Sequence, residues 1–124
     1  MKKILVVDDQ LEIREMIVDH FSLRGYHVLS AASVEEGIML ATKEEPDAIL
    51  LDLGFPQGIQ GDELLMQVKR NFPYIKIVMI TGESREHVRS RMLNLGADAF
   101  FDKGSSLKEI QAEVEKLIAS APEN

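Results

Sequence analysis

Five short aliphatic runs alternate along the chain with stretches whose apolar residues recur at helical spacing. The runs are Ile4–Val7, His27–Ala31, Ala48–Leu51, Lys76–Ile80 and Ala99–Phe101. Several runs are apolar without polar alternation, which is typical of strands covered by helices on both faces. Right-handed crossovers between such strands give a parallel sheet with helices on both sides. The sequence therefore predicts an α/β fold, a doubly wound (βα)5 domain with five parallel strands.

The helical stretches carry end signals and an apolar stripe. Two capping-box pairs open the second and fifth stretches, Ser33 with Glu36 and Ser106 with Glu109. Glycines at 25 and 96 lie where the first and fourth helices should end. The first stripe is Ile13, Met16, Ile17, His20 and Phe21. We interpret His20 as a half-buried histidine with its hydrogen bond satisfied, and the methionines at 16, 39, 66, 79 and 92 as core filler.

Length and charge limit the classes of function. The 124 residues suit one domain, which we expect over residues 1–120 with 121–124 as a tail or the start of a linker. The net charge of −7 repels phosphate backbones and argues against direct nucleic-acid binding. Every apolar run is far shorter than the roughly twenty residues of a membrane span. With no cysteine and no signal peptide, we expect a cytoplasmic protein without membrane contact.

Polar residues follow four of the five predicted strands. Asp8 and Asp9 follow the first strand, Asp52 the third and Lys103 the fifth, while Thr81 follows the fourth. In the flavodoxin-like strand order 2-1-3-4-5, strands one and three flank the switch point where ligands bind, at the carboxyl ends of the strands. We therefore expect three carboxylates, a hydroxyl and an ammonium to meet at one edge of the sheet.

These groups together suit two ligands. The three carboxylates repel one another, and a divalent cation relieves the repulsion; ligation by oxygen alone favours Mg²⁺, with Mn²⁺ possible. Thr81 and Lys103 offer a hydroxyl and a cation to a phosphoryl group. A carboxylate between the two can attack phosphorus, which would give an aspartyl phosphate. The pattern predicts an acidic phosphorylation site.

The chain closely resembles the receiver domain of bacterial two-component response regulators, which has the fold of the chemotaxis regulators. The resemblance runs from Lys3 to about Ile118 and rests on short motifs at the strand ends. The matching stretches are Ile4–Asp9, Asp47–Leu53, Pro56, Thr81–Gly82 and Gly96–Lys103.

The resemblance implies a role for each site residue. Asp52 is implied as the phosphoacceptor. Asp9 and Asp52 are implied as direct Mg²⁺ ligands, Asp8 as a ligand acting mainly through water, and the Gly54 carbonyl as a backbone ligand. Thr81 and Lys103 are implied as the phosphoryl-binding pair, and Phe100, three residues before the lysine, as the switch aromatic.

The resemblance also implies partners. A sensor histidine kinase or phosphotransfer protein would donate the phosphoryl group, and the chain would assist its own phosphorylation and slow dephosphorylation without being a conventional enzyme. A downstream protein partner or effector domain would contact the face made by the fourth helix, fifth strand and fifth helix, through Arg85, Arg89 and Asp98.

Three departures from the family pattern leave alternatives open. Phe55–Pro56 replaces Met-Pro, Pro56 to Gly61 is one residue longer than usual, and Gly104 follows the lysine in place of proline. We expect a trans Lys103–Gly104 bond, because a cis bond without proline costs about 2.5–4 kcal/mol. One alternative is a pseudo-receiver that binds a partner without phosphorylation. The other is a phosphohydrolase with an aspartyl nucleophile, although such enzymes commonly carry Asp-x-Asp and residue 54 is glycine.

Overall fold

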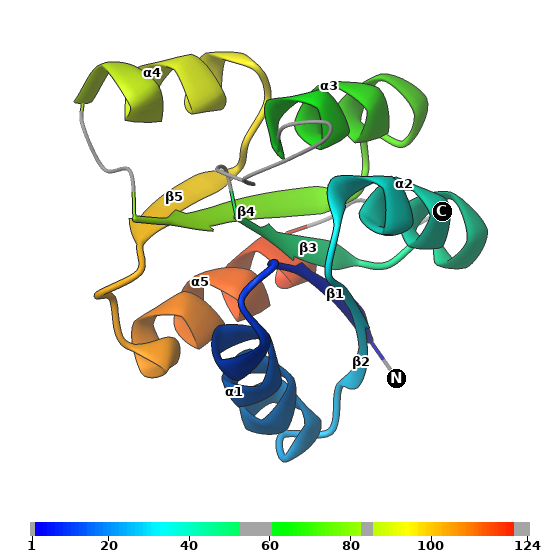
Figure 1. Ribbon diagram of the computed structural model, residues 1–124, viewed down its shortest axis with the longest axis vertical. Helices are drawn as coiled ribbons and strands as arrows, with labels where there is room; N and C mark the ends of the chain where they lie inside the picture. The colour runs from blue at the N-terminus through cyan, green and yellow to red at the C-terminus, as the bar shows by residue number, and fades with distance from the viewer. Residues whose placement is uncertain (1, 53–60, 83–85, 121–124) are drawn as a thin grey trace.

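The computed structural model describes residues 2–52, 61–82 and 86–120, which form a five-stranded parallel sheet flanked by helices (Figure 1). The strand order is β2-β1-β3-β4-β5, as predicted. The strands are β1 Lys3–Val7, β2 His27–Ala31, β3 Ala48–Leu51, β4 Lys76–Thr81 and β5 Ala99–Asp102. The helices are α1 Leu11–Ser22, α2 Val34–Glu44, α3 Gly61–Asn71, α4 Glu86–Asn94 and α5 Leu107–Ala119.

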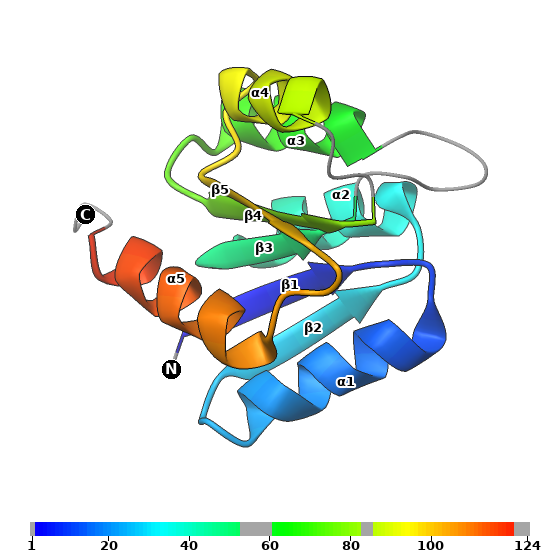
Figure 2. The same cartoon turned by 90° about the vertical axis from the view of Figure 1, so that its left-hand side faces the viewer.

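The sheet is the middle of three layers, with α1 and α5 on one face and α2, α3 and α4 on the other (Figure 2). Alternate residues of β1 enter different cores: Ile4 and Val6 pack with α1 and α5, and Leu5 and Val7 with the other helices. All four are at most 1% exposed. Burial on both faces is the physical reason that the strands read as unbroken apolar runs.

The local signals at the helix ends have the expected geometry. The Ser33 side chain accepts a hydrogen bond from the backbone N–H of Glu36, and Ser106 accepts one from Glu109, each at 3.1 Å. These bonds satisfy amide groups that the first turn of a helix leaves without a partner. Gly96 has φ +115°, a left-handed conformation that glycine adopts easily. It follows α4, so the chain turns there into β5.

The prediction for the methionines is wrong in three of five cases. Met79 and Met92 are fully buried, but Met16, Met39 and Met66 are 53%, 59% and 38% exposed. The buried stripe of α1 consists of Ile17 and Phe21, and Met16 lies beside it on the helix. His20 fits its expectation, because it is half-buried and its Nε2 lies 2.7 Å from the Gln111 side-chain oxygen on α5.

A glycine lets α2 approach the sheet closely, and replacing it should reduce stability. A Cβ on Gly37 would lie 2.9 Å from Leu64 Cδ1 and 3.0 Å from Val7 Cγ2. Overpacking of this kind costs about 1–3 kcal/mol, against about 1 kcal/mol gained from the better helix propensity of alanine. We expect Gly37→Ala to lower the free energy of unfolding in urea. Thr42→Ala, at an exposed position of the same helix, is the matched control and should not lower it.

Candidate functional site

The buried polar side chains of the domain gather at one edge of the sheet. Of the side chains that the structure describes, the buried polar or charged ones are Asp8, Asp52 and Thr81, at 3%, 5% and 2% exposed. Each stands at the carboxyl end of a strand, with Thr81 the last residue of β4. The backbone of Asp8 continues the ladder to β2 and that of Asp52 the ladder to β1, through bonds to the carbonyls of Ala31 and Val7. The three groups predicted from strand ends are thus neighbours.

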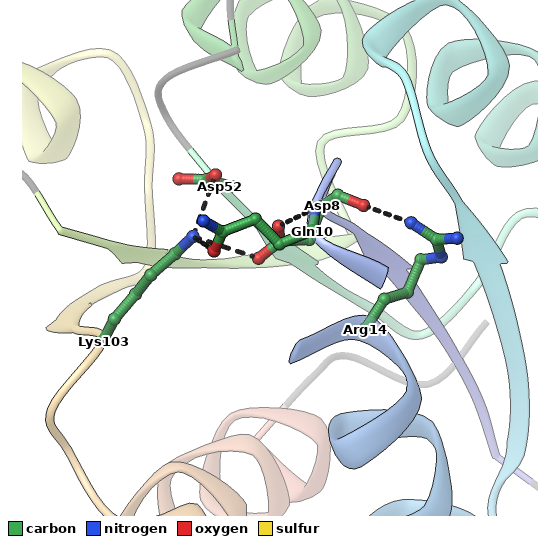
Figure 3. A network of polar contacts seen from close by, with 5 residues as sticks. All are labelled: Asp8, Gln10, Arg14, Asp52 and Lys103. Atoms are coloured by element: carbon green, nitrogen blue, oxygen red, sulfur yellow. Dashed lines mark hydrogen bonds and ion pairs between the residues drawn. The ribbon is translucent and has the colours of Figure 1, made fainter. Parts of the chain in front are cut away.

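Lys103 reaches this edge from the segment that follows β5. Its backbone N–H donates to the Thr81 carbonyl at 3.0 Å, which ties the start of that segment to the end of β4. Its ammonium Nζ lies 3.2 Å from Asp52 Oδ2, 3.4 Å from Asp8 Oδ2 and 2.8 Å from Gln10 Oε1 (Figure 3). The peptide bond to Gly104 is trans, as expected. The ammonium therefore lies among the carboxylates.

The three carboxylates are placed to share one cation. Carboxylate oxygens of Asp8, Asp9 and Asp52 lie within 4.8 Å of one another, and Asp9 is exposed to solvent. Burial raises the pKa of Asp8, and the charge of Asp52 raises it further, while the Gln10 N–H and Lys103 oppose both. A hard cation with oxygen ligands and some retained water fits this donor set. The residues present are suited to Mg²⁺ or Mn²⁺.

The structure adds two residues that sequence reasoning missed. The Gln10 backbone N–H donates to Asp8 Oδ1 at 2.9 Å, and the Arg14 guanidinium donates to the Asp8 carbonyl at 2.8 Å (Figure 3). Both lie at the start of the first helix region, directly after the Asp8–Asp9 pair. The signal in the sequence for the Arg14 contact was an arginine in the first turn of a helix that follows two acidic residues. Together they fix the conformation of the chain at Asp8.

Phe100 lies at the edge of the same region and is already in the core. It is 7% exposed and packs with Met92 and other residues on the side of α2, α3 and α4. The Arg89 guanidinium lies 5.9 Å from its ring centroid, and Arg89 also donates to the Phe100 carbonyl at 3.2 Å. The ring of Phe100 is therefore packed in the core beside Arg89.

Several expectations fall on residues outside the described part of the chain. These are the Gly54 carbonyl, the Phe55–Pro56 loop and Arg85. Asp98, expected on the partner-binding face, lines a groove there together with Arg89, and its carboxylate also accepts bonds from Lys69 Nζ and the Ile77 N–H, each at 2.8 Å. Its carboxylate joins α3 to β4, so its contacts within the domain are structural.

The crowded carboxylates should cost the metal-free domain stability. Because the pKa of Asp8 is raised in the folded state, that state holds more protons than the unfolded chain above about pH 4, and stability falls as the pH rises through the folded pKa. We expect Asp8→Asn to raise the urea midpoint at neutral pH without Mg²⁺ and to reduce the fall of the midpoint that begins as the pH rises above about 4. A lower midpoint for Asp8→Asn at neutral pH would contradict this account. Asp19→Asn, at an exposed position of α1, is the control.

Comparison with known proteins agrees with the fold and the strand-end chemistry. The family model for the response regulator receiver domain matches residues 4–115. The chain is 37% identical over 119 residues to the alkaline phosphatase synthesis transcriptional regulatory protein PhoP of Bacillus subtilis, covering 94% of this chain and 48% of that protein. It is 33% identical over 117 residues to sporulation initiation phosphotransferase F of the same organism, covering 94% of both.

Solved structures give the same result. A CheY-like receiver domain protein from Methanospirillum hungatei superposes with a TM-score of 0.91 at 28% identity, covering 96% of this chain and 94% of that one. The chain spans about half the length of most of the curated relatives named above or similar to them, and 94% of the length of sporulation initiation phosphotransferase F. With a family model over most of its length, the chain belongs to the response regulator receiver domains of two-component regulatory systems.

Proposed function

We propose that this receiver domain is a phosphoacceptor that takes a phosphoryl group on Asp52 from a sensor histidine kinase or a phosphotransfer protein. The observation that carries the proposal is the position of Asp52, which is buried at a strand end between other carboxylates and the Lys103 ammonium. A nucleophile needs its charge held in place and the charge of the incoming group offset, and both requirements are met by these neighbours.

Each site residue has one part in the proposed transfer. Asp9 and Asp52 would hold Mg²⁺ directly, with Asp8 acting through water; the cation supplies charge that offsets the phosphoryl oxygens. An Asp52 carboxylate oxygen attacks phosphorus, the new P–O bond forms, and the P–N bond to the donor histidine breaks. Lys103 Nζ and the Thr81 hydroxyl donate hydrogen bonds to the phosphoryl oxygens. Because Lys103 already lies beside Asp52, it has only a short distance to move.

We propose that the output passes through Phe100 and the face made by α4, β5 and α5. A groove on this face is lined by residues from all three elements, among them Arg89, Phe101 and Glu113. Arg89 contacts both the ring and the carbonyl of Phe100, so a change in Phe100 would alter the groove directly. Relatives named as transcriptional regulators and as a phosphotransferase support either an effector domain or a separate protein as the receiving partner.

Two other functions predict different outcomes. A pseudo-receiver would bind its partner without phosphorylation, and a phosphohydrolase would turn over an aryl phosphate. The pairing of buried Asp52 with half-buried Lys103 supports the phosphoacceptor, and glycine at position 54 in place of a second acid argues against the phosphohydrolase. Receiver domains are signalling domains, and we propose that this one only assists its own phosphorylation and slow dephosphorylation.

The setting of the domain is part of the proposal. In the part of the chain that the structure describes, no helix is long and apolar enough to cross a membrane. We propose a cytoplasmic protein, because phosphoryl transfer from a histidine kinase takes place there, and no direct contact with nucleic acid, because the net charge is −7. We also propose that residues 1–120 form the receiver domain, with 121–124 as a tail or the start of a linker.

Phosphorylation of Asp52 can be tested with a small-molecule donor. Incubation with acetyl phosphate and Mg²⁺ should add one phosphoryl group to the parent protein, read by intact mass, and Asp52→Asn should abolish it. Asp9→Asn should slow the reaction, because it weakens metal binding while leaving the nucleophile in place. Omission of Mg²⁺ is the matched control. A phosphoryl group mapped to another residue, or none on the parent, would refute the assignment.

The proposed output face can be followed by amide chemical shifts. Phosphorylation should move the signals of Arg89, Phe100 and Glu113 as well as those of the acidic strand ends. Strand β5 links the two regions, because it lines the groove and leads directly into Lys103. The parent protein with Mg²⁺ and no donor is the control that separates the effect of the metal from that of the phosphoryl group. Shifts confined to the ends of β1 and β3 would exclude this route of signalling.

A further inference from the structure

Gln10 makes a contact that its position in the helix does not require. It is the N-cap residue of α1, a position whose side chain usually accepts a bond from the first turn of the helix, but its side chain makes no such bond. Its Oε1 accepts instead from Lys103 Nζ at 2.8 Å, across 93 residues of sequence (Figure 3). This contact is shorter than those from the same ammonium to Asp52 and Asp8.

The Lys103 ammonium has three N–H donors and three acceptors around it. One acceptor is the neutral Gln10 amide, and the other two are Asp8 and Asp52, which belong to the acidic cluster. A divalent cation at that cluster and the ammonium compete for the same negative charge and repel each other. Any group that stabilises the ammonium in this position therefore opposes binding of the cation.

We propose that Gln10 is a positioning residue that holds the Lys103 ammonium over Asp8 and Asp52 in the metal-free protein, and so sets a low affinity for Mg²⁺. The inference rests on the proposed metal site. Gln10 carries no charge, so it acts on the metal through Lys103. By keeping the lysine beside Asp52, the same contact keeps it ready for an incoming phosphoryl group.

The test is direct titration with Mg²⁺ and no phosphoryl donor, followed by amide chemical shifts since the chain has no tryptophan. Gln10→Met keeps the length of the side chain and removes the acceptor. It should bind Mg²⁺ roughly threefold to tenfold more tightly, which corresponds to the net contribution of one typical hydrogen bond. Gln67→Met on α3, on the opposite face of the sheet, is the matched control and should bind Mg²⁺ like the parent.

A double-mutant cycle separates positioning from a general structural effect. In a Lys103→Met background, Gln10→Met should leave the Mg²⁺ affinity unchanged. In metal-free protein, the Lys103 ammonium protons should exchange with water faster in Gln10→Met than in the parent. An unchanged affinity in Gln10→Met, or the same gain with Lys103 absent, would overturn the inference.

The outcomes also separate this inference from the proposed function. If the cycle behaves as expected while Asp52 takes no phosphoryl group, Gln10 is a positioning residue and the phosphoacceptor proposal fails. If Asp52 is phosphorylated but the parent and Gln10→Met bind Mg²⁺ with the same affinity, the phosphoacceptor proposal stands and this inference fails. If neither parent nor variants bind Mg²⁺, this inference is refuted, whatever the mass spectra show.

Discussion

Repulsion among carboxylates at one edge of the sheet is the constraint on which the rest of the site depends. Asp8 and Asp52 are buried, and the exposed Asp9 lies next to them. Unrelieved negative charge is costly where water is excluded. The fold relieves it from two directions, with Lys103 contacting both buried carboxylates and the Gln10 N–H bonding to Asp8. The charge balance of the site therefore depends on the position of one lysine side chain.

The Lys103 ammonium is held in place by backbone hydrogen bonds as well as by its attraction to the carboxylates. The N–H of Lys103 bonds to the Thr81 carbonyl, and Thr81 pairs in register with Asp102. The Thr81 hydroxyl and the Lys103 ammonium, which we propose bind the phosphoryl group, thus come from the last residue of β4 and the residue directly after β5. A shift at the end of one of these strands would therefore displace the end of the other as well.

Much of this arrangement could be predicted from the sequence, because buried parallel strands have a strong apolar signature. Strand limits were correct to within a residue, and the strand order followed from the fold class. Asp8, Asp52, Thr81 and Lys103 were placed at one edge by topology alone. Their roles in phosphorylation remain predictions, and the Gly54 carbonyl lies outside the described residues.

The features that the sequence could not predict are contacts between residues far apart in the chain and apolar side chains that a helix tolerates on its surface. The bond from Lys103 to Gln10 joins positions 93 residues apart and leaves no local pattern. Exposed Met16 and Met39 were taken for core because methionine is apolar and flexible, and a helix surface accepts it at little cost.

The close approach of α2 to the sheet has a consequence for how relatives of this domain can diverge. Gly37 faces Val7, and Val7 is the residue directly before Asp8. A larger side chain at position 37 would have to displace Leu64 or Val7, and a shift of Val7 would reach the backbone of Asp8, its neighbour in the chain. Packing between α2 and the sheet therefore links the side-chain volume allowed at position 37 to the geometry of the acidic cluster, although α2 contributes no residue to that cluster.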